Sequence, residues 1–320
     1  SCGMKRIVQR KNRKMSVTID IHADDFGESV HASRDILDCL KDGKLNSISV
    51  LANMSCFEEC VNMYRREQDE FVWQPKISVH LNLLEGISLA GAENVPDLVN
   101  RDGHFKLSWE KLFFISFLPS RNKFKNQLKK EIELQIKTVV DAFPELSFKA
   151  IRIDSHQHTH MIPVVADALF EVIGEQKWQP EYIRDSREPM MPFLKKISLY
   201  KTFRPVNFIK NMLLKFCSSI QKKRFKEAGL APMYLWGLIM SGHMDEKRIV
   251  KLFSAMENKA EHDGRMLEIL FHPGRSSLEE ISKDVEQKDA IEFYISENRT
   301  IEKQAVYALD LAQKARKGER

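Results

Sequence analysis

Residues 17–27 read VTIDIHADDFG, a β-branched stretch that ends on two adjacent aspartates and a Phe-Gly pair. We predict a strand here, because β-branched residues next to a turn signal favour strands. Six further stretches of this kind lie at 47–51, 76–81, 149–154, 181–185, 233–239 and 266–271. Amphipathic helical stretches lie between them, and this alternation predicts parallel βαβ units. About seven parallel strands in 320 residues favour a distorted (β/α) barrel over a short open sheet.

The helical stretches and the insertions follow from residue spacing. Ser29 is expected to cap a helix that ends at Gly43, and residues 122–143 carry apolar side chains at helical spacing. The segments 84–121 and 186–230 interrupt the alternation, and long insertions in a barrel commonly form the rim or lids of a site. Because no Pro/Gly/Ser-rich linker divides the chain, we predict an α/β fold with a single domain and insertions.

The charge is unevenly distributed. The chain has 50 Lys+Arg and 45 Asp+Glu, a formal charge of +5. Residues 5–14 contain six basic residues, and residues 189–226 contain ten and no acidic residue. With these sixteen charges set aside, the net charge of the rest falls from +5 to −11. We therefore predict a basic N-terminal extension at 1–15, a domain at 16–320 and no nucleic-acid partner.

The five cysteines and the N-terminus bear on the compartment. The cysteines are few and odd in number, which favours a reduced cytoplasmic protein. The N-terminus lacks the apolar core of a signal peptide. The longest stretch without Asp, Glu, Lys or Arg, 228–244, contains a proline and three glycines, so we expect no membrane span.

Acidic and histidine side chains follow four of the predicted strands. Asp24 and Asp25 follow the first, His80 ends the third, DSHQHTH at 154–160 follows the fourth, and His272 follows the last. The carboxyl ends of barrel strands converge on one face, where catalytic groups gather. We therefore expect these four groups to meet in space.

Each group alone also has a structural explanation. An Asp-Asp pair before a helix is a common N-cap, a lone His80 is more often an interior residue, and His272 before Pro-Gly can start a turn. His156, His158 and His160 alternate, so in an extended chain all three would face one side, which favours a metal. Carboxylate and imidazole ligands without thiolate suit Zn²⁺ or another divalent ion in a hydrolytic site.

Taken together, these motifs resemble the YdjC-like carbohydrate deacetylases, a family that includes chitooligosaccharide deacetylase. The resemblance rests on ADDFG at 23–27, SVHLNL at 78–83, DSHQHTHM at 154–161, GLIMSGHM at 237–244 and LEILFHPG at 267–274. Asn298-Arg299 is also similar to the C-terminal signature of that family. The motifs occur in family order over residues 17–305.

The resemblance implies a metal-dependent hydrolase that removes acetyl groups from N-acetylated mono- or oligosaccharides. By position, Asp25, His80 and His156 would bind one divalent metal ion, Zn²⁺ or Mg²⁺. Asp24 would be the catalytic base, and His272 would protonate the leaving amine.

Four further residues are expected near the metal ligands: two histidines and two positions that depart from the family pattern. By the same resemblance, His158 and His160 would lie around the metal ligands or face the substrate. Ser33 stands where the family commonly has Asn, and Glu28 stands where it commonly has an apolar residue. We place both departures in the first helix and expect altered helix packing or substrate contact, with the metal retained.

Two other functions stay open at this stage. One is a different barrel metallohydrolase, such as a phosphoesterase, although one Asp and two His favour a mononuclear site. The other is a non-catalytic glycan-binding protein, which would need neither a base nor an acid. The sequence also leaves a homodimer open.

The insertion at 186–230 is not explained by the family pattern. Ile209, Leu213, Phe216 and Ile220 recur at helical spacing with lysines among them. This predicts a helix packed on the barrel with a solvated basic face. The alternative is a basic amphipathic lid at 189–226 that makes peripheral contact with an anionic or lipid-linked glycan.

Overall fold

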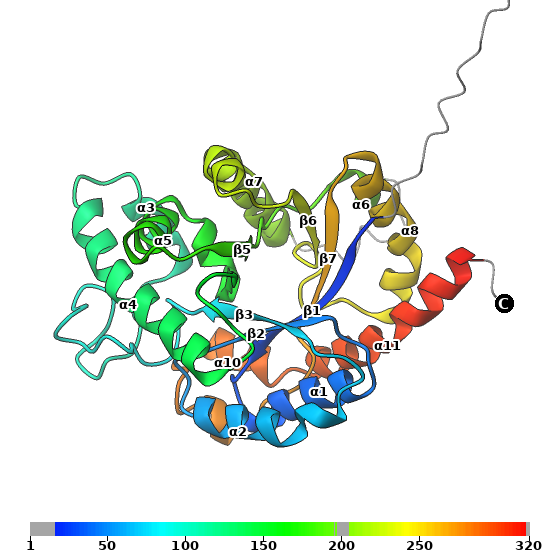
Figure 1. Ribbon diagram of the computed structural model, residues 1–320, viewed down its shortest axis with the longest axis horizontal. Coiled ribbons are helices and arrows are strands. Elements are labelled where there is room, and N and C mark those ends of the chain that lie inside the picture. The colour runs from blue at the N-terminus through cyan, green and yellow to red at the C-terminus, as the bar shows by residue number, and fades with distance from the viewer. Residues whose placement is uncertain (1–16, 195, 197–204, 318–320) are drawn as a thin grey trace, which may run out of the picture.

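The sheet is the frame on which every other element is placed. The computed structural model describes residues 17–194, 196 and 205–317. Seven parallel strands form one curled sheet in the order β5-β4-β3-β2-β1-β7-β6 (Figure 1). They are β1 (Ile19–Phe26), β2 (Ser47–Val50), β3 (Lys76–Leu81), β4 (Ile151–Ser155), β5 (Pro180–Ile183), β6 (Met233–Trp236) and β7 (Met266–Phe271). The predicted α/β fold with seven parallel strands is confirmed, as a half-barrel whose edge strands are β5 and β6.

Helices cover the outer side of the curled sheet (Figure 1). The described helices are α1 (Val30–Lys41), α2 (Phe57–Glu67), α3 (Trp109–Ile115), α4 (Arg121–Ala142), α5 (Pro163–Gln176), α6 (Met191–Leu194), α7 (Pro205–Glu227), α8 (Glu246–His262), α9 (Leu278–Ile281), α10 (Lys288–Tyr294) and α11 (Glu297–Lys317). Two short 3₁₀ turns, η1 (Gln68–Glu70) and η2 (His156–Met161), complete the described elements.

The predicted element boundaries agree with the structure to within a few residues. The strands predicted at 76–81 and 266–271 have the observed bounds, and the helix predicted at 122–143 is α4. Ser29 caps α1 as predicted, because its Oγ accepts a hydrogen bond from the Ala32 N–H at 3.0 Å. Gly43 follows α1 with a φ of +63°, which ends the helix at low steric cost.

The two sides of the sheet differ in polarity. Successive strand residues point to opposite sides. Ile48, Val79, Ile153 and Ile269 belong to one large apolar core between the sheet and the helices. The buried polar residues of the strands alternate with them: Asp20, His22, Asp24, Ser47, Ser49, Ser78, His80, Arg152, Asp154, Tyr182 and Glu268. The inner side of the half-barrel is therefore polar, which allows it to hold a charged site.

Helix α7 lies in the insertion and packs through a face that the sequence did not indicate. Its buried residues are Asn211, Leu214, Cys217, Ser218 and Gln221. Ile209, Phe216 and Ile220 are 62%, 50% and 44% exposed. The helix itself is confirmed, but the prediction that its regular apolar stripe packs on the barrel is wrong. The face of α7 that packs against the core is the narrower one around Leu214 and Cys217.

Other expectations concern the termini, the cysteines and a membrane. The extension predicted at 1–15 lies outside the described residues. The four described cysteines, Cys39, Cys56, Cys60 and Cys217, are free. In the described part of the chain, no helix has the length and apolar character that crossing a membrane requires.

The segment after β5 joins the two edges of the half-barrel. The Arg187 carbonyl accepts a hydrogen bond from the Leu235 N–H of β6 at 3.0 Å. The buried carboxylate of Glu188 accepts from the backbone N–H groups of Gly237, Leu238 and Ile239 at 2.7, 3.3 and 2.6 Å. One side chain thus provides acceptors for three donors that follow β6.

Replacing this carboxylate is expected to destabilise the fold. Glu188→Ala leaves buried N–H groups without an acceptor, and each such group costs roughly 1–3 kcal/mol. We expect the free energy of unfolding to fall by about 3 kcal/mol, measured by urea denaturation. The control is Glu175→Ala, whose carboxylate is exposed on α5. A loss equal to that of the control would contradict the assignment.

Candidate metal and catalytic site

Two consecutive aspartates reach the inner side of the half-barrel because the end of β1 is irregular. The register of β1 against β2 shifts between Ala23 and Phe26, and Asp25 has a φ of 69°. In a regular strand, consecutive side chains point to opposite sides. A bulge with a left-handed residue re-aims the second side chain. Asp24 and Asp25 are therefore both buried near His80, at 2% and 1% exposure.

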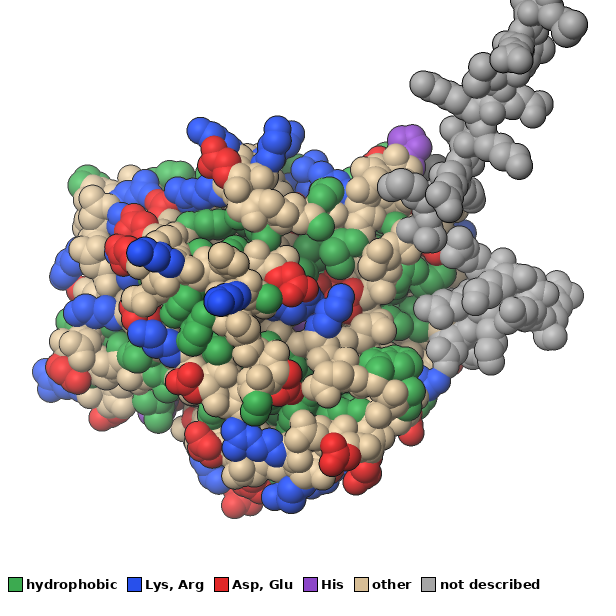
Figure 2. Space-filling model, in the orientation of Figure 1, with side chains coloured by type: hydrophobic (Ala, Val, Ile, Leu, Met, Phe, Trp, Pro, Cys, Tyr) green, Lys and Arg blue, Asp and Glu red, His purple; other side chains and the backbone are tan. Residues whose placement is uncertain are grey.

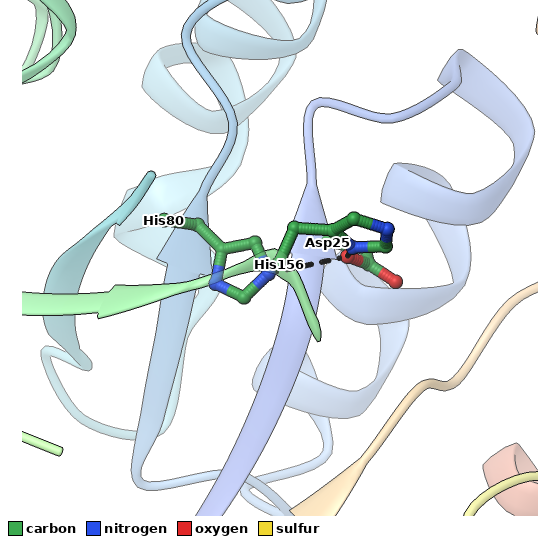
Figure 3. A group of neighbouring side chains, drawn as sticks. All are labelled: Asp25, His80 and His156. Atoms are coloured by element: carbon green, nitrogen blue, oxygen red, sulfur yellow. Dashed lines mark ion pairs between the residues drawn. The ribbon is translucent and has the colours of Figure 1, made fainter. Parts of the chain in front are cut away.

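Three side chains from three elements form a candidate metal site. The Oδ1 atom of Asp25 lies 3.4 Å from Nε2 of His80 and 3.4 Å from Nδ1 of His156 (Figure 3). One ligand atom from each residue lies within 4.8 Å of the others. The buried Asp25 Oδ1 and His80 Nε2 have no hydrogen-bond partner among the described residues. A carboxylate and two imidazoles with unpartnered, converging atoms fit a divalent metal ion.

In each imidazole, the nitrogen that points away from Asp25 lies beside a hydrogen-bond acceptor. The nitrogen that faces Asp25 is therefore available as a metal ligand. Nδ1 of His80 lies 2.6 Å from Asp154 Oδ1. Nε2 of His156 lies 3.2 Å from the Tyr294 hydroxyl and 3.4 Å from Glu85 Oε1. A metal-binding histidine commonly donates its second N–H to such a group, which fixes the tautomer and the ring orientation.

The surrounding carboxylates also favour protonation of both rings in the metal-free protein. Burial alone would lower the pKa of His80, but Asp24 and Asp154 outweigh it and raise that pKa to about 9. Burial is likewise outweighed at His156, where Glu85 and Asp25 raise the pKa to about 10. Protons and a metal ion therefore compete for the same nitrogen atoms.

Asp24 is held by a fully buried arginine. Arg184 donates to Asp24 Oδ2 at 3.0 Å through Nη1 and to Oδ1 at 2.8 Å through Nη2. Its Nη2 also lies 3.1 Å from Asp154 Oδ2, and its Nε donates to Glu268 at 2.6 Å. Burial alone would raise the pKa of Asp24, but Arg184 and His80 outweigh it and hold that pKa well below its usual range. Asp24 is therefore ionised.

Two other groups of acidic and histidine residues lie deeper inside the half-barrel. They are Asp20 with His22 and Glu268, and His22 with Asp24 and Asp154. Asp24, Asp154 and Glu268 are already paired with Arg184. A cation is disfavoured beside a guanidinium that pairs with all of these carboxylates. Asp25 also contacts a guanidinium, that of Arg299, but only through Oδ2, so its Oδ1 is left to the two imidazoles and this group is the best metal site in the described residues.

His272 lies on the other side of Asp24. Its Nε2 is 3.9 Å from Asp24 Oδ2, and its Nδ1 is 3.4 Å from Glu302 Oε2. The backbone N–H of His272 donates to the same Glu302 oxygen at 2.6 Å. The structure thus brings together all five residues for which the sequence predicted a role.

His158 and His160 take no part in this group, because 156–161 is not extended. Gln157 and His158 have positive φ values of 51° and 60° within the turn η2. His158 Nδ1 lies 3.0 Å from Ser186 Oγ, and His160 bonds Ser155 Oγ and the Arg184 carbonyl at 2.6 and 2.7 Å. The expectation of three histidines on one side of an extended chain is wrong.

The two departures from the family pattern lie against Asp25. Arg299 donates to Asp25 Oδ2 at 3.2 Å and to Glu28 Oε2 at 2.5 Å. Ser33 Oγ accepts from the Gly27 N–H at 2.9 Å. Glu28 precedes the cap of α1, so its predicted place in the first helix is wrong. Both departures hold the loop that carries Asp25.

A cavity of about 500 Å³ adjoins the metal group at His156. Its walls come from the loop after β3, from α3, from α7 and from α10. They include Glu85, Leu107, Trp109, Glu110, Lys210, Ala290, Phe293 and Tyr294. A partly apolar cavity with a few polar groups is the usual form of a small-molecule site.

Sequence reasoning missed three residues of the site. Arg184 lies in the stretch 181–185, so the rule that strand ends carry function would have included it. Glu85 lies in an insertion and Tyr294 ends α10. Neither has a local signal, because each reaches His156 only through the tertiary fold.

The chain belongs to the YdjC-like family. The sequence model of the family described as "YdjC-like protein" matches residues 18–317. Curated relatives named carbohydrate deacetylase include one from Danio rerio, 26% identical over 64% of this chain and 58% of the relative. Another, from Brevibacillus brevis, is 25% identical over 51% of this chain and 58% of the relative. The matches span little more than half of the length of these relatives.

A solved structure has the same fold. The crystal structure of a candidate cellobiose-phosphate cleavage protein from Enterococcus faecalis V583 aligns with a TM-score of 0.64. The alignment covers 95% of each chain at 17% sequence identity. At this identity the likeness establishes the fold.

Removing one imidazole is expected to abolish metal binding. His80→Ala deletes one of three converging ligands, so bound metal is expected to fall at least about tenfold. The measurement is metal content per chain after dialysis against a fixed free-metal concentration. His262→Ala is the control, because that ring is 83% exposed on α8. Metal content equal to that of the control would exclude His80 as a ligand.

Metal binding is also expected to depend on pH. With pKa values of about 9 for His80 and 10 for His156, both imidazoles are in the cationic form, with both nitrogens protonated, at neutral pH in the metal-free protein. Binding requires neutral rings, so affinity should rise as pH rises toward 9, with release of about two protons per ion. Calorimetry in two buffers of different ionisation enthalpy counts these protons. A count near zero would contradict the assignment.

Proposed function

We propose that this protein is a metal-dependent carbohydrate deacetylase that hydrolyses the N-acetyl amide of a mono- or oligosaccharide. The observation that carries the proposal is the meeting of two groups at one end of the half-barrel. The unpartnered ligand atoms of Asp25 and His80 lie beside His156, and the ionised Asp24 lies between them and His272. The names of the curated relatives support the same reaction.

Asp25, His80 and His156 would hold the metal ion. Their donor set of one carboxylate and two imidazoles suits Zn²⁺ and accommodates Mg²⁺ less well, since Mg²⁺ prefers oxygen ligands. When bound, the ion would polarise the acetyl carbonyl and lower the pKa of the attacking water. Arg299 draws the second oxygen of Asp25 away, so that Oδ1 alone faces the two rings.

Asp24 would accept the proton of the attacking water. Its pairing with Arg184 keeps it ionised, so it is ready to accept a proton over a wide pH range. The same pairing makes it a weak base, and a weak base is sufficient only when the water is made more acidic. Asp24 and the metal group are therefore mutually dependent in this proposal.

His272 would give a proton to the leaving nitrogen. It lies on the side of Asp24 that faces away from His80. Glu302 accepts a hydrogen bond from its backbone N–H, and its Nδ1 lies 3.4 Å from the same carboxylate oxygen. Protonation of the amine is needed because an unprotonated amide nitrogen is a poor leaving group. The base and the acid thus come from β1 and from the turn after β7.

The cavity beside His156 would bind the sugar. Trp109 and Phe293 offer apolar surface to the C–H groups of a pyranose, and Glu85, Glu110 and Lys210 offer polar atoms to its hydroxyl groups. The acetyl group would then lie toward His156, where the cavity meets the metal group.

The two alternative functions have less support. A phosphoesterase with several metal ions would need the deeper carboxylates, with which Arg184 is already paired. A glycan-binding protein would gain nothing from a buried Asp24 within 3.9 Å of His272.

Replacing the base tests the proposal. We expect Asp24→Asn to retain its metal and to lose at least about 100-fold in the rate of acetate release from N-acetylated chitooligosaccharides. Thermal unfolding shows whether the variant folds without its charge pair to Arg184. The control is Asp102→Asn, at an exposed turn in the insertion after β3. Full turnover by Asp24→Asn would exclude Asp24 as the base.

A panel of N-acetylated mono- and oligosaccharides, with acetate and metal measured in the same preparation, tests the reaction itself. If the metal-loaded protein releases acetate from none of them, soluble N-acetyl sugars are excluded as substrates.

A further inference from the structure

Nearly half of the exposed apolar side chains lie on two helices that reach the cavity, or next to one of them. Eighteen large apolar side chains are exposed in the described part of the chain. Eight of them belong to α3 with the turn after it and to α7, the two helices that both contribute to the cavity wall. They are Phe114, Phe117, Leu118, Val206, Ile209, Met212, Phe216 and Ile220. Apolar residues gathered in this way mark an interaction surface, whereas scattered ones do not.

On α7 these residues form one stripe that begins beside the cavity. Val206, Ile209, Phe216 and Ile220, here called the α7 stripe, recur at helical spacing. At about 100° per residue, Lys210 lies within the buried face, about 40° around the helix from Val206 of the stripe. Lys210 is also a wall residue of the cavity. The stripe therefore leads outward from the cavity and extends for roughly 20 Å along the helix.

Positive charge accompanies the stripe. Helix α7 carries six basic residues and one acidic residue, Glu227. Lys223 and Lys226 are exposed and lie along one flank of the stripe at about 100° per residue. Arg224 pairs with Asp167 of α5, which fixes the helix to the body of the protein. Figure 2 shows Lys and Arg side chains next to apolar ones where Figure 1 places α7. A second copy of this chain would bring the same positive charge to the contact and would be repelled.

An anionic lipid surface complements all of these features. Apolar residues along one side of a helix, with lysines beside them, are typical of helices that lie in the interface of a membrane. Lysines that lie next to the membrane surface are attracted by anionic lipid headgroups. Because the stripe starts at the cavity, a helix lying on the bilayer would hold the mouth of the cavity at headgroup level.

We propose that the α7 stripe docks on an anionic membrane and that the substrate is an N-acetylated sugar carried by a lipid. This inference rests on the proposed deacetylase function. The sugar would enter the cavity while its lipid tail stays in the bilayer. Water would add to the acetyl carbonyl and the C–N bond would break. Acetate would leave, and the amine would remain on the lipid-borne sugar.

Vesicle sedimentation tests the docking without reference to catalysis. We expect the protein to bind phosphatidylglycerol-containing vesicles and to bind pure phosphatidylcholine vesicles much more weakly. The triple variant Ile209→Ser, Phe216→Ser, Ile220→Ser should lose at least about tenfold in binding, because it removes three side chains that enter the bilayer. The matched control is Val72→Ser, Val250→Ser, Leu278→Ser, which removes three exposed apolar residues outside α3 and α7.

The docking proposal is overturned if the wild-type protein does not bind the anionic vesicles, or if both triple variants bind them equally. It is also overturned if light scattering shows that the stripe variant only converts a dimer into a monomer. In that case the stripe contacts a second copy of the chain.

Acetate release separates this inference from the function on which it rests. On an N-acetylglucosaminyl lipid in anionic vesicles, the stripe variant should be at least about tenfold slower than the control variant. On soluble N-acetylated chitooligosaccharides the two should be equal. Turnover of the soluble sugars without turnover of the lipid-borne sugar overturns the substrate assignment alone. Absence of acetate from every substrate, with normal vesicle binding, overturns the proposed function and leaves the docking intact.

Discussion

The buried guanidinium of Arg184 is the interaction on which the site depends. Without it, Asp24, Asp154 and Glu268 would be three carboxylates in a water-poor interior, where unpaired charges are very costly. Asp154 in turn fixes His80, so the candidate base and a candidate metal ligand share one counterion. The ion pairs of Arg184 therefore couple Asp24, the candidate base, to His80 of the metal group through Asp154.

This coupling is possible because the half-barrel separates its two sides by polarity. The apolar residues of the strands face the helices and supply the stability of the fold. The inner side is free to hold ions, and these ions pair with polar groups from other strands, in the case of Arg184 and Glu268 across the half-barrel. Asp25 Oδ1 and His80 Nε2 are among the buried atoms without a hydrogen-bond partner, and both face the proposed metal ion.

Much of this arrangement could be predicted from the sequence, because strand ends and helix caps are local features. The strands, the cap at Ser29 and the meeting of the four groups at strand ends follow from such signals, whereas the choice of Asp25, His80 and His156 among them rests on the resemblance to the family. The turn at 156–161 could not be foreseen, since two non-glycine residues adopt positive φ there. The partners Glu85 and Tyr294 and the packed face of α7 depend on contacts between segments far apart in the chain, which no local pattern encodes.

The junction after β5 has a consequence for how the protein behaves in a crowded solution. A sheet that does not close keeps edge strands, and an open edge is a template on which a foreign strand can add. At the β6 edge, the Arg187 carbonyl and the Glu188 carboxylate already occupy the backbone donors of Leu235, Gly237 and Ile239. The first residues of the insertion thus protect the half-barrel against aggregation at its β6 edge.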